Sequence, residues 1–209
     1  MTKKNLNIKI FFIIKIIFIY LIFSLKSYSD NKDANDSFVV LGLDEAPVKI
    51  KIFSSFTCPH CAKFHTEVVL KIKKKYIENG VVQLIFIDFP LDQIAFNASK
   101  LLHCLEKKNQ LEFLDTIYET QNTWILGSNE NEINENLEKI AKNLGINSAQ
   151  FGVCLNNEVI SDKILSGRID ANQKYSINST PTIIINEKKL EGSVSFKNIE
   201  KNIENLFSL

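Results

Sequence analysis

The sequence has almost no net charge. It contains 25 Lys and Arg against 24 Asp and Glu, which gives a formal charge of +1 for 209 residues. Five lysines and no acid fall within residues 1–29, so the rest of the chain has a net charge of about −4. A chain without a basic excess gives no electrostatic support to a nucleic-acid partner. It also lacks internal repeats and low-complexity tracts, apart from an overall richness in Lys, Asn and Ile.

The apolar run near the N-terminus is too short for a typical membrane-spanning helix. Lys15 interrupts it, and the uninterrupted part, "IIFIYLIFSL" (16–25), falls well short of the roughly 20 residues that span a bilayer. Lys3 and Lys4 precede it, and small residues flank Tyr28 after it. A basic start, an apolar core and small residues in that order are typical of a secretory signal peptide. We expect cleavage after residue 29, with an uncleaved membrane anchor facing the periplasm as the alternative, and a flexible polar tail over 30–37.

Export determines how the four cysteines are interpreted. The chain ends in "NLFSL", which is no endoplasmic-reticulum retention signal, so the bacterial periplasm is the predicted location. In an oxidising compartment an even number of cysteines favours disulfides, whereas Cys-x-x-Cys in the cytosol favours a metal site.

The order of predicted elements divides the chain in three. Strands over 38–43, 48–55 and 81–89 flank a helix from 58 to about 79, which is a strand–helix–strand opening. Residues 91–176 show helical periodicity throughout. A hairpin over 180–192 and a final helix over 196–208, capped by Ser195, complete the chain. The predicted helices of the middle part are 91–108, 110–121, 131–144, 148–155 and 157–175.

The motif Cys58-Pro59-His60-Cys61 stands where the second strand meets the first helix. A thiolate at a helix N-terminus is stabilised by unpaired N–H groups and by the helix dipole. Pro59 suits the first helical position, where its missing N–H costs nothing. His60 can hydrogen-bond to the thiolate or lie beside it as a cation. The pattern therefore predicts that Cys58 attacks and that Cys61, one turn further and more buried, resolves.

Together with Thr180-Pro181 at the start of a late strand, this motif resembles the DsbA-type thiol:disulfide oxidoreductases. The likeness covers essentially the whole chain after the signal segment. It implies an α/β thioredoxin fold over 38–90 and 177–209, with a helical insertion over 91–176. It also implies a protein disulfide oxidoreductase without cofactor or metal, and a cis Thr180-Pro181 bond opposite the cysteines. Ile52 departs from the family, whose members commonly have a buried acid six residues before the first active-site cysteine.

Further expectations rest on the same resemblance. Cys104 and Cys154 are expected to form a structural disulfide, with two reduced buried cysteines as the alternative. Expected substrates are unfolded secreted proteins with free thiols, and the expected reoxidant is a DsbB-like quinone-linked membrane protein. We expect a monomer without a nucleic-acid partner. His65 is predicted at the helix surface, and neither His65 nor His103 is assigned a chemical role.

Three other functions compete with an oxidase. A c-type haem site is excluded, because Ala62 stands where the histidine after the second cysteine would be. A periplasmic metal carrier could use Cys58, Cys61 and His65, with Cys104 as a further candidate ligand, but no second ligand pair has suitable spacing. The nearer alternative is a disulfide isomerase or reductase of the same fold. The short tail before Phe38 leaves no room for the added dimerisation domain that such isomerases usually have.

Overall fold

The structure is a computed structural model and describes residues 38–208. The predicted signal segment (1–29) and tail (30–37) lie outside the described residues. Within the described part of the chain, residues 39–208 belong to one compact unit. The helices between the two halves of the sheet therefore pack with the sheet and do not form a separate body.

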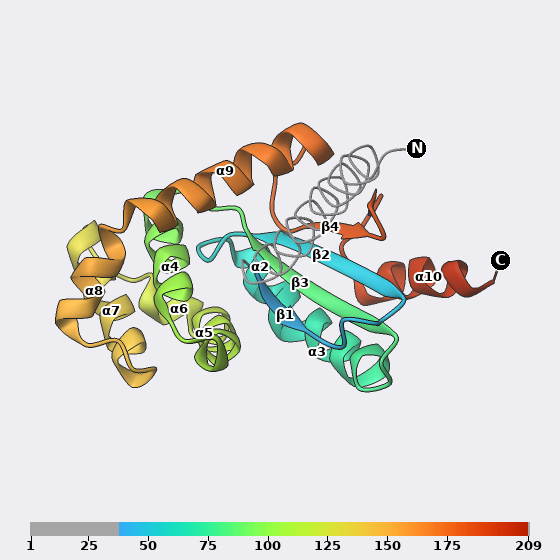
Figure 1. Ribbon diagram of the computed structural model, residues 1–209, viewed down its shortest axis with the longest axis horizontal. Coiled ribbons are helices and arrows are strands. Elements are labelled where there is room, and N and C mark those ends of the chain that lie inside the picture. The colour runs from blue at the N-terminus through green and yellow to red at the C-terminus, as the bar shows by residue number, and fades with distance from the viewer. Residues whose placement is uncertain (1–37, 209) are drawn as a thin grey trace, which may run out of the picture. The chain divides into compact units, whose positions relative to one another are not determined.

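A five-stranded mixed sheet forms the centre of the fold (Figure 1), and its strand order is β1-β3-β2-β4-β5. The strands β2 and β3 run parallel, and every other neighbouring pair is antiparallel. The element order confirms the predicted α/β fold, with a strand–helix–strand opening and a strand–strand–helix end. The strands are β1 (Val39–Leu41), β2 (Val48–Ser54), β3 (Val82–Asp88), β4 (Thr182–Ile185) and β5 (Lys188–Lys189).

A helical segment crosses over between β2 and β3, as parallel neighbours require. It combines two short α-helices with two π-helical turns. The sequence repeats apolar residues at spacings of four along it, which predicts one inward face made of Phe64, Val68, Ile72 and Tyr76. Three of these are buried and Val68 is partly buried. Gly80 ends it with a φ of +70°, which glycine adopts without a steric cost. The pieces are α2 (Pro59–Lys63), η1 (Phe64–Val69), α3 (Leu70–Ile72) and η2 (Lys73–Ile77).

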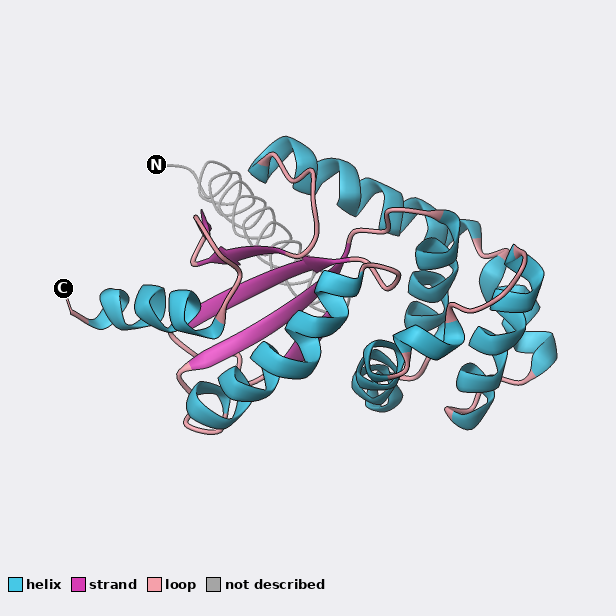
Figure 2. Cartoon of the chain, turned by 180° about the vertical axis from the view of Figure 1, so that it is seen from behind, coloured by secondary structure: helices cyan, strands magenta, loops and turns pink. Residues whose placement is uncertain are grey.

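The final helix α10 (Phe196–Phe207) covers the same face of the sheet as α2 and α3 (Figure 2). The Ser195 hydroxyl accepts a hydrogen bond from the Asn198 N–H and caps this helix as predicted. The helical period predicts that Ile199, Ile203 and Leu206 face inward. Ile199 and Ile203 are buried, but Leu206 is 39% exposed, so its predicted inward position is wrong. Figure 1 shows the reason, because the last turns of α10 extend beyond the strands.

Six helices connect β3 to β4. Asp92, Asn129, Asn147 and Asn157 cap four of them through their side chains. The break between the first two helices falls at Leu105, whose backbone is extended, so the predicted end of the first helix at 108 is too late. The helices are α4 (Gln93–Cys104), α5 (Lys107–Glu119), α6 (Gln121–Trp124), α7 (Glu130–Asn143), α8 (Ser148–Leu155) and α9 (Glu158–Tyr175).

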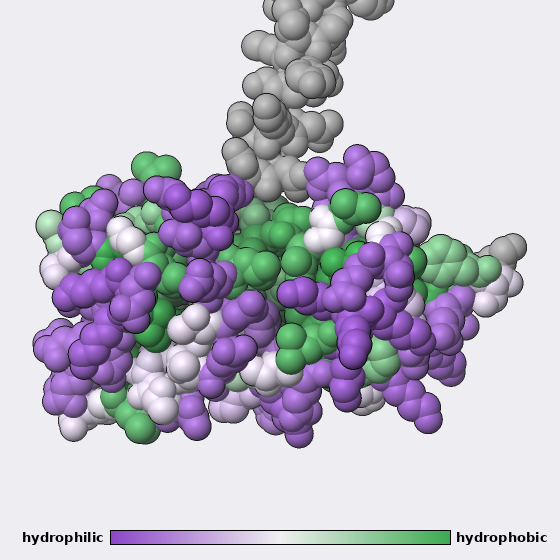
Figure 3. Space-filling model, turned by 90° about the horizontal axis from the view of Figure 1, so that it is seen from below, coloured by the Kyte–Doolittle hydropathy of each residue, from purple (hydrophilic) through white to green (hydrophobic). Residues whose placement is uncertain are grey.

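One hydrophobic core joins the sheet to these helices. Ile50 and Leu84 from the strands and Phe113 and Leu137 from the helices are all fully buried members of one cluster. Trp124 belongs to it and donates its ring N–H to the Ile117 carbonyl at 2.7 Å. Figure 3 shows one face on which apolar residues gather near the middle, while hydrophilic residues cover most of the remainder. The continuous core holds the insertion at a defined place against the sheet.

Candidate active site

The cysteine motif lies at the C-terminal end of β2. Cys58 is the N-cap of α2 with extended backbone angles, and Pro59 takes the first position of the helix. The Cys58 carbonyl accepts hydrogen bonds from the Cys61 and Ala62 N–H groups at 3.0 and 3.2 Å. Both cysteines are free thiols in this structure. Strand β2 therefore leads directly to Cys58 at the N-terminus of α2, and Cys61 lies in the first turn of this helix.

The two thiols have different surroundings. Cys58 is 8% exposed, and its thiol donates a hydrogen bond to the Thr180 carbonyl at 3.4 Å. Cys61 is 1% exposed. Burial raises the pKa of the Cys61 thiol to about 12. Cys61 therefore holds its proton at neutral pH, and Cys58 is the thiol nearer the surface.

The Thr180-Pro181 peptide bond is cis. This loop lies directly against the motif, because the Thr180 carbonyl accepts the Cys58 hydrogen bond. Thr182 continues into β4, and its hydroxyl donates to the Ser179 carbonyl at 2.7 Å. The strand order places β4 next to β2, which brings residues more than 100 positions apart together.

A cleft of about 570 Å³ opens beside the cysteines. One wall is the exposed side of α2 and η1, the second is the cis-proline loop, and the third is the segment before α10. The lining mixes apolar side chains with charged ones. The residues are His60, Lys63, Phe64, Glu67, Val68, Lys71, Thr180, Pro181, Val194, Ser195 and Phe196.

The insertion contacts the motif through Gln121, a residue that the sequence analysis did not select. The buried amide of Gln121 donates to the Phe56 carbonyl at 2.7 Å and to the Cys58 carbonyl at 3.0 Å. On the outer side, the Thr57 hydroxyl donates to the Asp92 carboxylate at 2.6 Å. Both contacts join residues far apart in the chain, so no local pattern could indicate them.

Replacing Gln121 with alanine is expected to lower the free energy of unfolding by about 2 kcal/mol, because the Phe56 carbonyl loses its buried donor. Urea unfolding followed by circular dichroism measures the change. Gln173→Ala, at an exposed position of α9, is the matched control, with an expected loss below about 0.5 kcal/mol. Equal losses in the two variants would contradict the role of the Gln121 amide.

The predicted surface position of His65 is wrong. His65 is 6% exposed, its Nε2 atom lies 2.6 Å from the Asp115 carboxylate, and its ring centroid is 4.9 Å from that of Tyr118. The reason is that His65 lies between α5 and the sheet, since its ring centroid is also 5.7 Å from that of Phe86 in β3. His103 also has a carboxylate partner, because its Nε2 atom lies 2.7 Å from Asp88.

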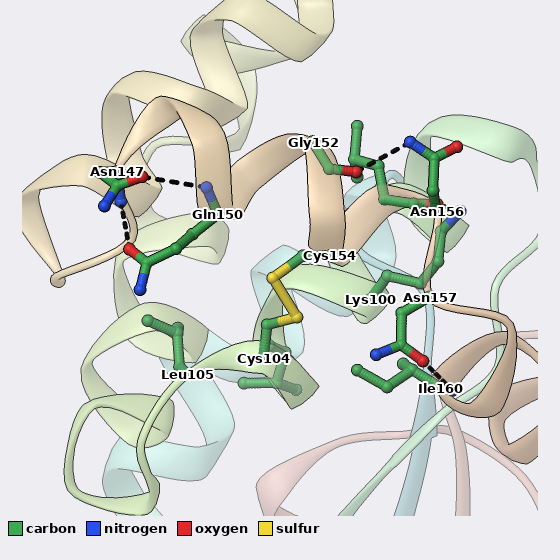
Figure 4. Close-up of a disulfide and its surroundings, with 12 residues drawn as sticks. Lys100, Cys104, Leu105, Asn147, Gln150, Gly152, Cys154, Asn156, Asn157 and Ile160 are labelled. Carbon is green, nitrogen blue, oxygen red and sulfur yellow. Dashed lines mark hydrogen bonds between the residues drawn. A yellow bond between two sulfur atoms is a disulfide. The ribbon is translucent and has the colours of Figure 1, made fainter.

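Cys104 and Cys154 form a disulfide that links the end of α4 to α8 (Figure 4), with a Cα–Cα distance of 5.9 Å. At the start of α8 the side chains of Asn147 and Gln150 form a reciprocal capping box. The Cys104 sulfur is therefore bonded to Cys154 and is not a free thiol. Within residues 38–208 no group of three or more His, Cys, Asp or Glu is arranged to hold a metal ion. The same part of the chain contains no helix that is both long and apolar enough to cross a membrane.

A paired dithiol at a helix N-terminus, facing a cis-proline loop, defines a protein suited to thiol–disulfide exchange. The family model described as Thioredoxin matches residues 34–205, so the chain belongs to this family. "Probable disulfide bond formation protein D" of Bacillus anthracis is 31% identical over 172 residues, covering 76% of each chain.

The chain is also similar to solved structures of DsbA-like proteins. α-DsbA1 of Wolbachia pipientis is 29% identical with a TM-score of 0.72 and covers 82% of this chain and 91% of its own. BdbD of Bacillus subtilis is 26% identical with a TM-score of 0.71, covering 83% and 94% respectively. Within the thioredoxin family the chain is a DsbA-like thiol:disulfide oxidoreductase.

Proposed function

We propose that this protein is an oxidase that donates the Cys58–Cys61 disulfide to unfolded proteins with free thiols. The observation that carries the proposal is the contrast between the two thiols. Cys58, 8% exposed, lies against Thr180 of the loop that lines the cleft, and Cys61 is 1% exposed with a pKa raised to about 12. A substrate thiolate can approach the first sulfur beside the cis-proline loop, whereas the second is shielded and prefers its protonated form.

The reaction proceeds in two exchanges. A substrate thiolate attacks Cys58, a sulfur–sulfur bond forms between them, and the electron pair of the broken Cys58–Cys61 bond goes to Cys61, which takes up a proton. A second thiolate of the same substrate then attacks the substrate sulfur of the mixed disulfide. The substrate gains a disulfide and loses two electrons, and Cys58 leaves as a thiolate at the N-terminus of α2.

The remaining site residues have supporting roles in this proposal. Pro59 starts the helix without an unpaired N–H, and His60, which lines the cleft, stabilises the Cys58 thiolate. The Thr180 and Pro181 loop gives an extended substrate segment a place to pair beside Cys58. The cleft carries Phe64 and Val68 between charged residues, which suits loose binding of unfolded chain.

The cellular setting is part of the same proposal. Residues 1–29 direct export to a bacterial periplasm and are removed, and the protein acts there as a monomer without nucleic acid. A DsbB-like quinone-linked membrane protein reoxidises the dithiol after each turnover. An isomerase or reductase of the same fold would need an electron supply instead.

The decisive test is the reduction potential of the Cys58–Cys61 pair. The protein is equilibrated in glutathione buffers of graded ratio, and the reduced fraction is counted by mass after alkylation. A potential above about −180 mV is expected, together with rapid oxidation of a reduced two-cysteine peptide. A value near −270 mV, that of thioredoxin, would overturn the oxidase proposal in favour of a reductase.

A further inference from the structure

A second cleft, of about 510 Å³, lies along helix α9, and we call it the α9 cleft. Three apolar side chains in its lining are exposed, since Leu91, Leu165 and Ile169 have exposures of 47%, 42% and 55%. Leu165 and Ile169 are one helical turn apart, so they share one side of α9. Exposed apolar side chains that gather in one cleft are typical of a binding surface. The exchange reaction described above uses none of these residues.

The α9 cleft and the cleft lined by His60 lie on opposite faces of the sheet. The ring centroid of Phe53 in β2 is 5.8 Å from that of Tyr175 in α9. The preceding side chain in β2, Ile52, points to the other face and belongs to the same cluster as Ile199 of α10. Figure 1 shows α9 on the other side of the strands from α3 and α10.

Both clefts reach the cis-proline loop. The cleft lined by His60 includes Thr180 and Pro181, and the α9 cleft includes Ile177 and Asn178. Consecutive Cα atoms are about 3.8 Å apart, so the Cα atoms of Asn178 and Thr180 are at most about 8 Å apart. The cis-proline loop therefore separates two clefts that an extended chain could occupy at once.

The other wall of the α9 cleft also adjoins the cysteine motif. The Leu91 N–H donates to the Ser55 hydroxyl at 3.3 Å, and the Cys58 N–H donates to the Ser55 carbonyl at 3.1 Å. An extended chain advances by roughly 3.3 Å per residue. A substrate whose cysteine lies at Cys58 therefore needs only a few further residues to enter the α9 cleft.

The only arginine of the sequence lines this cleft. The guanidinium carbon of Arg168 lies 5.2 Å from the centre of the buried Phe89 ring, a cation–π contact that orients the group. No acidic side chain within residues 38–208 forms an ion pair with Arg168. Asp170 is two residues further along α9, and residues two apart do not face each other on a helix. The guanidinium is always charged, and its paired donors match a carboxylate.

We propose that the α9 cleft binds a second part of the unfolded substrate, an extended segment in which an acidic residue lies between apolar ones. The apolar side chains pack on Leu91, Leu165 and Ile169, and the carboxylate pairs with Arg168. The segment belongs to the same chain as the reacting cysteine, because the cleft adjoins the motif and the cis-proline loop. The proposal rests on the proposed function for the identity of the ligand. It adds a preference for substrates that carry such residues two to four positions from the cysteine, on one side of it.

The experiment measures a single exchange step with synthetic peptides. The protein carries Cys61→Ser, so the adduct on Cys58 is stable. Each peptide is a glycine–serine chain with one central cysteine, activated as a mixed disulfide with 2-thiopyridine. The Cys58 thiolate bonds to the peptide sulfur, and pyridinethiolate leaves with the electron pair and is measured by its absorbance. Each rate is divided by the rate of the same peptide with glutathione, which removes differences in intrinsic reactivity.

Five peptides are compared at low ionic strength. Two carry leucine–glutamate–leucine at positions two to four before or after the cysteine, two carry leucine–glutamine–leucine there, and the parent carries neither. One of the two glutamate peptides is expected to react at least about fivefold faster than the parent. It is also expected to react about threefold faster than its glutamine counterpart, because the glutamine cannot pair as an anion with Arg168. In Arg168→Gln this second ratio is expected to fall to about 1.

Lys163→Gln is the matched control. Lys163 is an exposed cation of the same helix that lies outside the cleft, so the ratio of glutamate to glutamine peptide is expected to remain about threefold in this variant. The ratio compares two peptides on one protein, so a general loss of folding or of Cys58 reactivity cancels. The proposal is overturned by a ratio that Arg168→Gln leaves unchanged, by an equal fall in both variants, or by equal rates for all five peptides.

Other occupants of the α9 cleft give different results. A dimer in sedimentation velocity that Arg168→Gln dissociates would place a second copy of this chain in the cleft and overturn the proposal. Equal peptide rates, with slower reoxidation of Arg168→Gln by bacterial membrane vesicles, would assign the cleft to the membrane reoxidant and also overturn it. Adduct formation does not depend on the reduction potential of the cysteine pair. A thioredoxin-like potential therefore overturns the oxidase and leaves the peptide result standing, whereas equal peptide rates overturn only the α9 cleft.

Discussion

Replacing Cys61 with serine is expected to turn the protein into a covalent trap for its substrates. A mixed disulfide that forms on Cys58 can then be released only by a thiol of the substrate itself or by an added thiol, because the resolving sulfur is missing. Cys58→Ser is expected to lose exchange activity altogether, at least about a thousandfold, since the remaining Cys61 is 1% exposed and protonated at neutral pH.

The trap is measured by incubating each variant, in its reduced form, with a peptide that carries one activated disulfide. Cys61→Ser is expected to accumulate the peptide adduct to one equivalent, the wild type to form it only transiently, and Cys58→Ser to form none. Circular dichroism confirms that the variants are folded. Adduct formation on Cys61 in the Cys58→Ser variant would contradict the assignment of the attacking thiol.

The features that could be predicted from the sequence are those that depend only on residues adjacent in the chain. The Cys58–Cys61 pair follows an alternating strand and starts a periodic helix, so its place at a helix N-terminus was predictable. Ser195 is a helix cap defined by its immediate neighbours, and the hairpin of β4 and β5 turns at Asn186 and Glu187, which both have positive φ.

The features that were missed depend on segments that meet only in three dimensions. The periodicity of its own helix predicts His65 at the surface. The contact that buries it comes from α5, some 50 positions later in the sequence. Gln121 shows no local signal for its two bonds to the motif. The pairing of Asp88 with His103 joins a strand end to a helix of the insertion, and the strand register that places Ser54 beside Asp88 is likewise long-range.

Removing the disulfide between Cys104 and Cys154 is the second change with a large expected effect. The bond joins residues 50 positions apart, and its loss frees the unfolded chain to explore many more conformations. In the chain-entropy model a loop of this size is worth about 4 kcal/mol. Cys104→Ala/Cys154→Ala is therefore expected to lower the free energy of unfolding by about 4 kcal/mol and Tm by on the order of 10 °C.

The folded state keeps its own connection between the same two helices, because the Lys100 ammonium on α4 donates to the Leu155 carbonyl at the end of α8 at 2.6 Å. The loss should therefore arise mainly in the unfolded state. A matched comparison uses Cys58→Ser/Cys61→Ser, in which reductant breaks only the structural bond and should lower stability by the same amount. Urea unfolding measures both, and a loss below about 1 kcal/mol in either would contradict a stabilising role for this disulfide.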